Sequence, residues 1–272
     1  MLPESLIDMF VFLFGLAVGS FLNVLAYRIP EEKEVARGRS HCRGCLKELA
    51  WHELIPLVSF VLLRGKCRTC RSPIPVQYPL VELVTGILFL FTWKVFGASP
   101  FLLSAVFAML YALFGLCVLI VLFITDLRYF LIPDRIMLLA IGVAVAAVAL
   151  NKLFFQCGLP GVPCSVLGVF LSLLGAAFFL ALVLVSGGRW MGLGDVKLAV
   201  FMGLFLGFAK LIAALLIAFF AGSVIGSILI LLRKKNLKSE VPFGAFLAPA
   251  TAISFFLGDT LLKSVHLLPF RW

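Results

Sequence analysis

The sequence predicts an all-α polytopic membrane protein with about eight transmembrane helices and a four-cysteine polar domain inserted after the first helix. Of the 272 residues, 63% are hydrophobic and 13% are charged, and the mean hydropathy is +1.16. No soluble core needs so much apolar surface. Apolar segments long enough to cross a bilayer recur along the chain, and one sizeable polar segment interrupts them. We therefore expect a first helix (1–26), a cysteine domain (27–78) and a membrane-embedded domain (79–272).

The first apolar segment runs from about Leu6 to Ala26, which is long enough to span a bilayer. No Lys or Arg precedes Arg28, and no small-residue cleavage site is evident. A signal peptide carries both a basic N-terminal region and a small-residue cleavage site. The segment therefore reads as a retained transmembrane helix.

The composition changes between Tyr27 and Tyr78, where ten Lys or Arg residues and four of the seven cysteines lie. Cationic loops of membrane proteins stay in the cytoplasm, so this domain is expected there. The ten cations are Arg28, Lys33, Arg37, Arg39, Arg43, Lys47, Arg64, Lys66, Arg68 and Arg71.

About seven further spans follow by the twenty-residue criterion. The least secure boundary is at Gly207–Lys210, between the two spans that precede the last one. The expected spans lie near Leu80–Phe96, Phe101–Thr125, Ile132–Leu150, Ser165–Ser186, Val196–Phe208, Leu211–Leu232 and Ala245–Val265.

The distribution of cations orients these spans. Of the 23 Lys and Arg residues, eighteen fall in the predicted inner loops. The other five, on the outer side, are Lys94, Lys152, Lys210, Lys263 and Arg271. Both chain termini are then outside. The basic excess is thus explained by orientation in a lipid bilayer, and no basic run interleaved with aromatics suggests nucleic-acid binding.

Gly192-Leu193-Gly194-Asp195 breaks an apolar run and places a carboxylate ahead of a new helix. Two interpretations of Asp195 stand beside each other: a helix N-cap and a catalytic group. A second carboxylate, Asp126, ends an inward-running helix, where the helix dipole disfavours an anion. Carboxylates at membrane depth are costly and usually functional.

The remaining aspartates have simpler explanations. Asp8 and Asp259 fall on the outer side, so neither can share a site with Asp195. Asp134 follows Pro133 at the start of a helix, where we expect it to act as a cap.

Two carboxylates that meet near one membrane face can share a proton, one activating water while the other polarises a carbonyl. We expect Asp195, at a helix N-terminus near Lys197, to be the base and Asp126 to be the acid. No G-x-S-x-G or H-E-x-x-H motif supports a serine or zinc peptidase. A transporter that uses the two carboxylates as an ion relay is the alternative from another class.

Two Cys-x-x-Cys pairs, Cys42/Cys45 and Cys67/Cys70, enclose 21 residues. Four soft ligands in two close pairs suit tetrahedral Zn²⁺, and the site would be structural because no ligand position is left for water. Disulfides are disfavoured in a reducing cytoplasm. His41 and His52 are expected to be surface residues, whereas Cys157 and Cys164 lie in an outer loop and could pair.

Several short sequence blocks occur in an order that resembles the bacterial type IV prepilin peptidases, the GxGD class of membrane aspartic proteases. The blocks are Gly19–Asn23, Tyr27–Pro30, the paired cysteines, Tyr78–Leu83, Asp126 ahead of Ile132–Asp134, Gly192–Lys197 and Pro242–Ala248. In the last block Ala245 stands where the family usually has proline, a departure that we expect to touch no catalytic role.

The resemblance implies a protease dyad of Asp126 and Asp195 that cuts a short basic leader from prepilins or pseudopilins at the cytoplasmic face. Members with the cysteine loop also methylate the new N-terminus with S-adenosylmethionine. The bacterial inner membrane is the implied location, with periplasmic termini, and type IV pilus or type II secretion systems supply the implied partners. A GxGD protease for another substrate is the alternative within the class.

Glu82, early in the second span, is a candidate cofactor-binding residue for methyl transfer because an intramembrane carboxylate is expensive. The alternative is a structural partner for Asn23 or a loop arginine.

Overall fold

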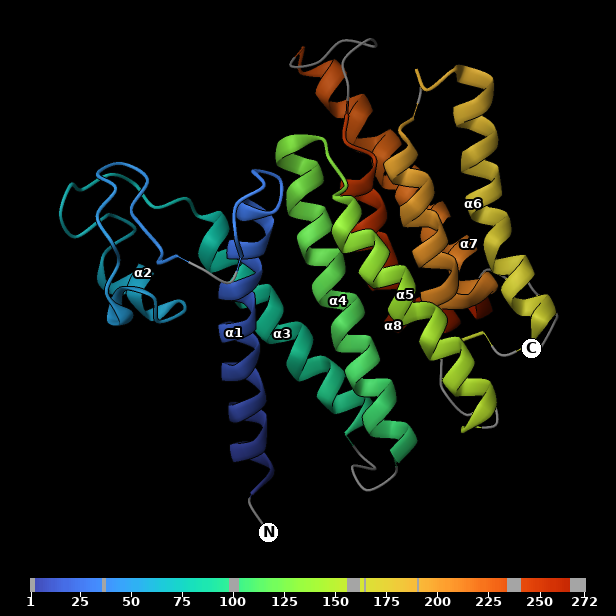
Figure 1. The fold of residues 1–272 in the computed structure, drawn as a ribbon, viewed down its shortest axis with the longest axis horizontal. Helices are drawn as coiled ribbons and strands as arrows, with labels where there is room; N and C mark the ends of the chain where they lie inside the picture. Colours follow the sequence, from blue (N-terminus) through green and yellow to red (C-terminus); the bar gives the residue numbers. More distant parts are fainter. Residues whose placement is uncertain are drawn as a thin grey trace. The chain divides into compact units, whose positions relative to one another are not determined.

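The computed structural model describes residues 3–35, 38–97, 103–155, 162–163, 165–189, 191–233 and 241–264 (Figure 1). These residues form helices joined by loops, with two isolated β-bridges and no strand among them, so the all-α prediction is confirmed. The elements are α1 (Glu4–Arg28), the short 3₁₀ turn η1 (Trp51–Glu53), α2 (Val58–Leu62), α3 (Gln77–Phe96), α4 (Leu103–Tyr129), α5 (Asp134–Leu153), α6 (Val166–Ser186), α7 (Leu193–Leu231) and α8 (Gly244–Ser264).

Seven of the helices in the described part of the chain are long and apolar enough to cross a membrane. Their bounds follow the predicted spans closely, with one difference: the predicted spans Val196–Phe208 and Leu211–Leu232 are joined in the 39-residue α7. Within α7, Gly207 has φ 73° and ψ 169°, a conformation that glycine adopts without strain and that interrupts the helix.

The chain reverses direction at Gly207, as the contacts of α7 with α8 show. Before the break, Gly194 packs on Ile132, which also packs on Gly244 at the start of α8, while Phe205 stacks on Phe255 at 4.9 Å. After the break, Lys210 lies beside Phe255 and Phe219 returns to Phe243, with ring centroids 5.1 Å apart. The two legs of α7 therefore run in opposite directions, which reconciles seven helices with the eight predicted spans.

The chain forms two compact units, one up to Val121 and one from Leu122, so α4 contributes to both. In the first unit α1 packs closely on α3. A Cβ on Gly15 would lie 2.8 Å from the Gly86 Cα, and one on Gly19 would lie 2.8 Å from the Glu82 Cα. The absence of side chains at these positions lets the two backbones approach.

In the second unit α6 packs against both legs of α7. A side chain on Gly203 would collide with the Ser172 carbonyl oxygen, and one on Gly175 would lie 2.7 Å from Leu211. Stacked rings of Phe201, Phe205 and Phe255 fill the space between α7 and α8.

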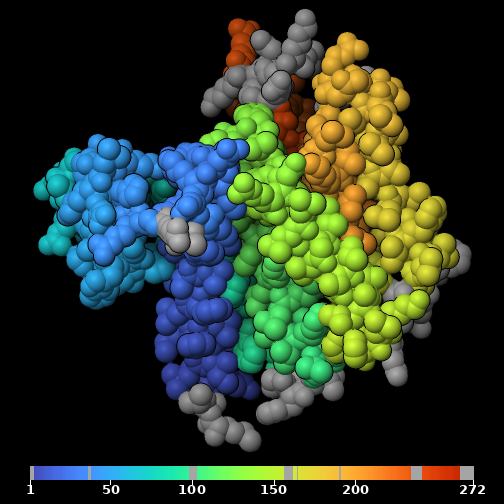
Figure 2. Space-filling view, viewed as in Figure 1, coloured from blue at the N-terminus to red at the C-terminus, as the bar shows by residue number. Residues whose placement is uncertain are grey.

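Large apolar side chains cover the outside of the helices, as expected for surfaces that face lipid. Figure 2 shows one such face, on which α5 (yellow-green) and α6 (gold) lie fully open to view. Well-exposed examples are Leu138, Leu139, Phe170, Leu184 and Val185.

The two aspartates predicted to lie on the outer side form ion pairs with lysines that the predicted topology also places outside. Asp8 lies 2.6 Å from Lys94 in the first unit, and Asp259 lies 2.8 Å from Lys210 in the second. Lys210 follows the Gly207 break, so Asp259 is at the opposite end of the second unit from Asp195.

Candidate active site and metal centre

Asp126 lies in the last turn of α4 with 6% of its surface exposed. Its Oδ2 accepts a hydrogen bond of 2.7 Å from the Ala245 backbone N–H, and the Gly244 amide also bonds to the carboxylate. These amides are the free donors at the N-terminus of α8, which is a natural anion site. The C-terminal end of the α4 dipole disfavours the Asp126 anion, and the N-terminal end of the α8 dipole offsets this effect.

Gly244 is required beside this carboxylate for a steric reason. A Cβ at this position would lie 2.9 Å from Asp126 Oδ2 and 3.1 Å from its Cγ. Ala245 supplies the N–H that Asp126 accepts, and proline, which has no N–H, could not. The alanine that stands where the family usually has proline therefore supplies a hydrogen bond to Asp126 that proline could not.

Asp195 is the third residue of α7, whereas Gly192 holds the N-cap position, so the N-cap interpretation is wrong in detail. The Asp195 carboxylate bonds back to the Gly192 amide, as an acidic residue at the third helical position commonly does. Beside it, Gly194 packs against the side chain of Ile132, with a built Cβ 3.0 Å from Ile132 Cβ.

The structure brings Asp126 and Asp195 together. Ile132 packs against the glycine beside each carboxylate, Gly194 and Gly244, and so places the two side chains at the same end of the second unit. Both carboxylates belong to the second unit. Two close, largely buried carboxylates can hold one proton between them, which is the arrangement needed for general acid–base chemistry.

One expectation about a neighbouring residue, that Asp134 caps the helix that begins there, is wrong. Pro133 is the N-cap of α5, and Asp134 makes no capping bond; its Oδ1 instead pairs with Lys197 Nζ at 2.6 Å. The ammonium group of Lys197 therefore forms its ion pair with Asp134. Because the Asp126 carboxylate lies at the N-terminus of α8 and Asp195 lies at that of α7, the dipole argument that made Asp195 the base does not distinguish them.

Glu82 is 7% exposed, and its carboxylate is bonded within the first unit. Its Oε2 accepts a 2.9 Å hydrogen bond from the Leu57 backbone N–H, and the Ser20 hydroxyl also bonds to it. The predicted structural partners, Asn23 and a loop arginine, are therefore wrong. Asn23 Nδ2 donates instead to the carbonyls of Gly19 and Tyr78, at 3.2 Å each.

The four predicted metal ligands converge. The Sγ atoms of Cys42, Cys45, Cys67 and Cys70 all lie within 4.8 Å of one another, and Cys42 and Cys70 are 3.6 Å apart. In a tetrahedral site with Zn–S bonds of about 2.3 Å, the sulfurs are about 3.8 Å apart. The donor set and its spacing therefore fit Zn²⁺, with no position left for water.

Each cysteine pair lies in a hairpin, and the second hairpin repeats the first 25 positions later. The Cys42 amide bonds to the Lys47 carbonyl, and the Cys67 amide bonds to the Ser72 carbonyl, both at 2.9 Å. Leu46 and Arg71, at matching positions, have φ of 58° and 59°. The shared Cys-x-x-Cys spacing is the sequence signal for this repeat.

Hydrogen bonds prepare one thiol for metal binding. The Ser72 hydroxyl and the amides of Cys45 and Gly44 lower the pKa of Cys42 to about 5. A thiolate is the form that binds zinc. Among the residues described by the structure, no other group of three or more potential ligands was found, and His41 and His52 are exposed, as expected. Cys157 and Cys164 lie outside the described residues.

Arginine side chains tie the cysteine domain to the ends of α1 and α3. The Arg43 guanidinium lies 4.1 Å from the ring centroid of Tyr27 and 5.4 Å from that of Tyr78, and donates to the Tyr78 hydroxyl at 2.6 Å. Arg28 donates to four loop carbonyls, those of Glu34, Val35, Gly38 and Arg39. The metal centre is therefore held level with the ends of the two helices.

Comparisons with known proteins cover both units. Residues 13–96 match the family model described as the bacterial peptidase A24 N-terminal domain, and residues 113–227 match the type IV leader peptidase family. A prepilin leader peptidase/N-methyltransferase of Bacillus subtilis is 32% identical over 256 residues, which is 93% of this chain and 95% of the relative. Proteins of the same name from Legionella pneumophila and Aeromonas hydrophila are 31% and 32% identical, over 92% and 93% of this chain and 91% of each relative. No solved structure matches.

The metal centre leads to a direct prediction. The purified protein should contain one zinc per chain, and Cys67→Ser should lose it and unfold at lower temperature, because a structural metal contributes to folding. Metal analysis and thermal unfolding measure both effects. Cys117→Ser is the matched control, since Cys117 lies in α4 away from the cluster. Full zinc content in Cys67→Ser would contradict the assignment.

Proposed function

Because the chain belongs to the prepilin leader peptidase/N-methyltransferase family, we propose that it removes the leader from type IV prepilins or pseudopilins and methylates the new N-terminal residue. The observation that carries the proposal is the close pair of carboxylates, Asp126 and Asp195, at the N-termini of α8 and α7. The family likeness extends through both units, so the cysteine domain and the peptidase part belong to one enzyme. We divide the chain into a first helix (1–26), the cysteine domain (27–78) and a membrane-embedded peptidase domain (79–272).

Leader cleavage uses the two carboxylates as one acid–base pair. The ionised carboxylate takes a proton from water, and the water oxygen bonds to the scissile carbonyl carbon. The protonated partner gives its hydrogen to the carbonyl oxygen. Collapse of the tetrahedral intermediate breaks the C–N bond: the leaving amine takes the proton that the first carboxylate removed from water, and a hydroxyl proton of the intermediate returns to the second carboxylate. Asp126 and Asp195 act as a unit, with the amides of α8 fixing the position of Asp126.

For methyl transfer, S-adenosylmethionine would supply the methyl group to the new N-terminal amine. One observation in the first unit fits a polar ligand: Asn23 Oδ1 is buried and has no hydrogen-bond partner among the described residues. Asn23 lies one helical turn from Gly19, whose backbone abuts Glu82. We keep Glu82 as the candidate residue for the cofactor or amine site, with Asn23 beside it.

We propose that the cysteine domain and the dyad face the cytoplasm of a bacterial inner membrane and that both termini are periplasmic. The cationic loops support this orientation. The alternative of an ion-relay transporter has less support, because Asp8 and Asp259 are paired with lysines and extend no carboxylate path from the dyad.

The orientation can be tested on intact cells. A membrane-impermeant maleimide should not label Lys47→Cys, because ten cations hold this domain inside. Lys152→Cys, on the predicted outer side, should be labelled under the same conditions, with the parent chain as background. Labelling of Lys47→Cys without cell lysis would reverse the proposed topology.

The dyad can be tested on each carboxylate. Asp126→Asn and Asp195→Asn should each slow leader cleavage by at least about a hundredfold, since either change removes a proton-carrying partner. Incubation with a prepilin followed by N-terminal mass analysis measures cleavage. Asp259→Asn, at the far end of the second unit, should cleave normally.

The same samples test whether the two activities are separable. An already trimmed pilin should still be methylated by the Asp126→Asn and Asp195→Asn proteins when S-adenosylmethionine is present. Cleavage that survives in Asp195→Asn would refute the dyad, whereas loss of both activities would refute only separate sites.

The steric role of Gly244 gives an independent prediction. Gly244→Ala should displace the Asp126 carboxylate and reduce cleavage by about a hundredfold, the effect expected of a misplacement of about 1 Å. Gly226→Ala is the matched control, because a Cβ there meets nothing within 4 Å. Equal activity of the two variants would show that the close contact at Gly244 is not needed.

A further inference from the structure

The loop between the two cysteine hairpins carries an exposed apolar surface that the proposed chemistry does not use. It contains η1, α2 and the residues between them, and Leu62 and Trp51 are 76% and 79% exposed. We call it the apolar loop; its exposed large apolar side chains are Trp51, Leu54, Ile55, Val58, Val61 and Leu62. Soluble domains rarely expose so many neighbouring apolar side chains.

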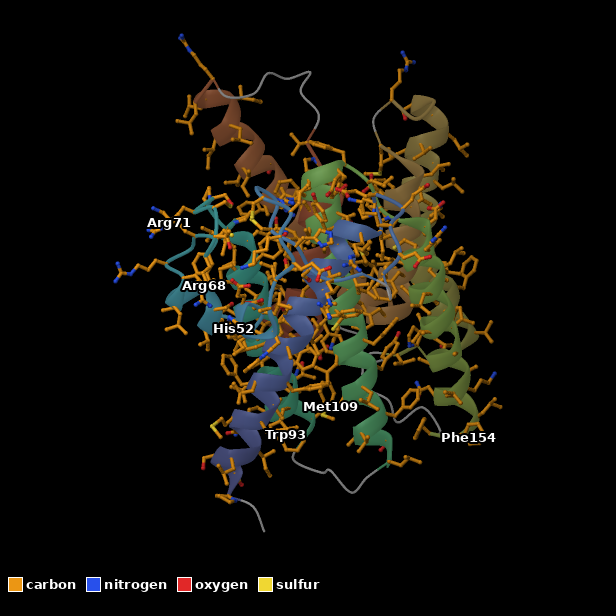
Figure 3. The ribbon with its side chains drawn as sticks, turned by 60° about the vertical axis from the view of Figure 1, so that its left-hand side comes forward. His52, Arg68, Arg71, Trp93, Met109 and Phe154 are labelled. Atoms are coloured by element: carbon orange, nitrogen blue, oxygen red, sulfur yellow. The ribbon has the colours of Figure 1, made fainter. Side chains whose placement is uncertain are left out.

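Four exposed cations follow the apolar loop, and no acidic residue lies between Leu54 and Val76. The cations are Arg64, Lys66, Arg68 and Arg71. Figure 3 shows Arg68 and Arg71 projecting outward from the domain. An apolar surface with a tryptophan next to a group of basic side chains is typical of segments that lie in a membrane interface.

The tether between Leu57 and Glu82 sets the depth of the loop. Glu82 is the sixth residue of α3, so its Cα lies about 7.5 Å along the helix from its first residue. On the facing helix, Glu82 packs against Gly19, nine residues before the end of α1. The hydrogen bond to Leu57 therefore holds the loop beside the helices rather than beyond their ends. Figures 1 and 3 agree, since α2 and His52 both lie at heights within the length of α1.

The backbone at the tether is strained. Leu57 has φ 58° and ψ −47°, and the Val58 amide bonds to the Pro56 carbonyl at 2.6 Å, which defines a γ-turn with positive φ. Such turns are rare and persist only where surrounding contacts hold them. The turn directs the Leu57 N–H to Glu82 and leaves Val58, Val61 and Leu62 facing outward.

We propose that the apolar loop inserts into the headgroup–acyl boundary of the adjacent leaflet, with Arg64, Lys66, Arg68 and Arg71 on anionic lipid phosphates. The loop is continuous with α3, which crosses the same bilayer, and lies at a depth where lipid surrounds the helices. Segments of this kind bury their apolar face about 5–10 Å into the boundary, comparable with the depth of Glu82. A second copy of the chain or a substrate helix would not need a cationic border.

Photocrosslinking of the full-length protein tests the proposal. p-Benzoylphenylalanine replaces Leu62 in one protein and Leu46 in another, in vesicles of phosphatidylethanolamine with a minority of phosphatidylglycerol. Leu46 is the matched control: it is also 76% exposed, but it lies in the first cysteine hairpin, level with the helix ends. After irradiation, mass analysis identifies the adducts, and a probe at Val61 provides a second position should the first protein fail to fold.

The Leu62 protein should give a several-fold higher yield of lipid adduct than the Leu46 protein. Phosphatidylglycerol should exceed its share of the vesicle among the adducts, and this excess should disappear in an Arg68→Gln, Arg71→Gln protein. Equal lipid yields at the two positions, adducts to a second copy, or no lipid adduct at either Leu62 or Val61 would overturn the proposal. An unchanged excess of phosphatidylglycerol in the arginine variant would overturn the role of these cations.

Discussion

In the second unit, the backbone amides at the start of α8 hydrogen-bond the Asp126 carboxylate at the end of α4, and the other contacts of the site are arranged around this junction. A carboxylate inside an apolar bundle is costly unless polar groups face it. Here the donors come from the start of α8, so α8 must begin where α4 ends. The reversal at Gly207 then returns the chain to the same end of the unit. Ile132 fills the space between Gly194 and Gly244 and thereby brings Asp195 to the carboxylate.

Among the described residues the buried acidic groups are Asp126 and Glu82, and both are stabilised in the same way. Each accepts a hydrogen bond from a backbone amide of a distant segment, at 2.7 Å from Ala245 and at 2.9 Å from Leu57. Neither has an arginine or lysine as a partner in the described part of the chain. A backbone amide donates a hydrogen bond without bringing a second charge to be desolvated, so it suits a carboxylate at membrane depth. In both units a charged group therefore fixes how a non-adjacent segment docks.

The sequence predicts what depends on composition and local spacing. Helix bounds follow from apolar length, and the four cysteines follow from paired spacing. It does not reveal contacts that join distant residues, such as Lys197 with Asp134, 63 positions apart, or Asp126 with Ala245, 119 positions apart. The reversal near Gly207 is predicted from apolar length, because 39 residues exceed one span, whereas its exact position is fixed only by the dihedral angles of Gly207. The strained turn at Leu57 is similarly invisible, because leucine carries no signal for positive φ.

The donor at Ala245 belongs to the main chain, and this has a consequence for genetics. Replacing Ala245 with any residue except proline leaves the N–H in place, and because Ala245 is buried, a mutational scan would report the packing cost of a larger side chain rather than the hydrogen bond. Only proline deletes the donor, and proline is what the resembling family usually carries there. The contact would therefore escape notice in a scan of this protein, and a comparison of homologues would score the position as a neutral difference. The residue at position 245 decides whether one or two backbone amides donate a hydrogen bond to the Asp126 carboxylate.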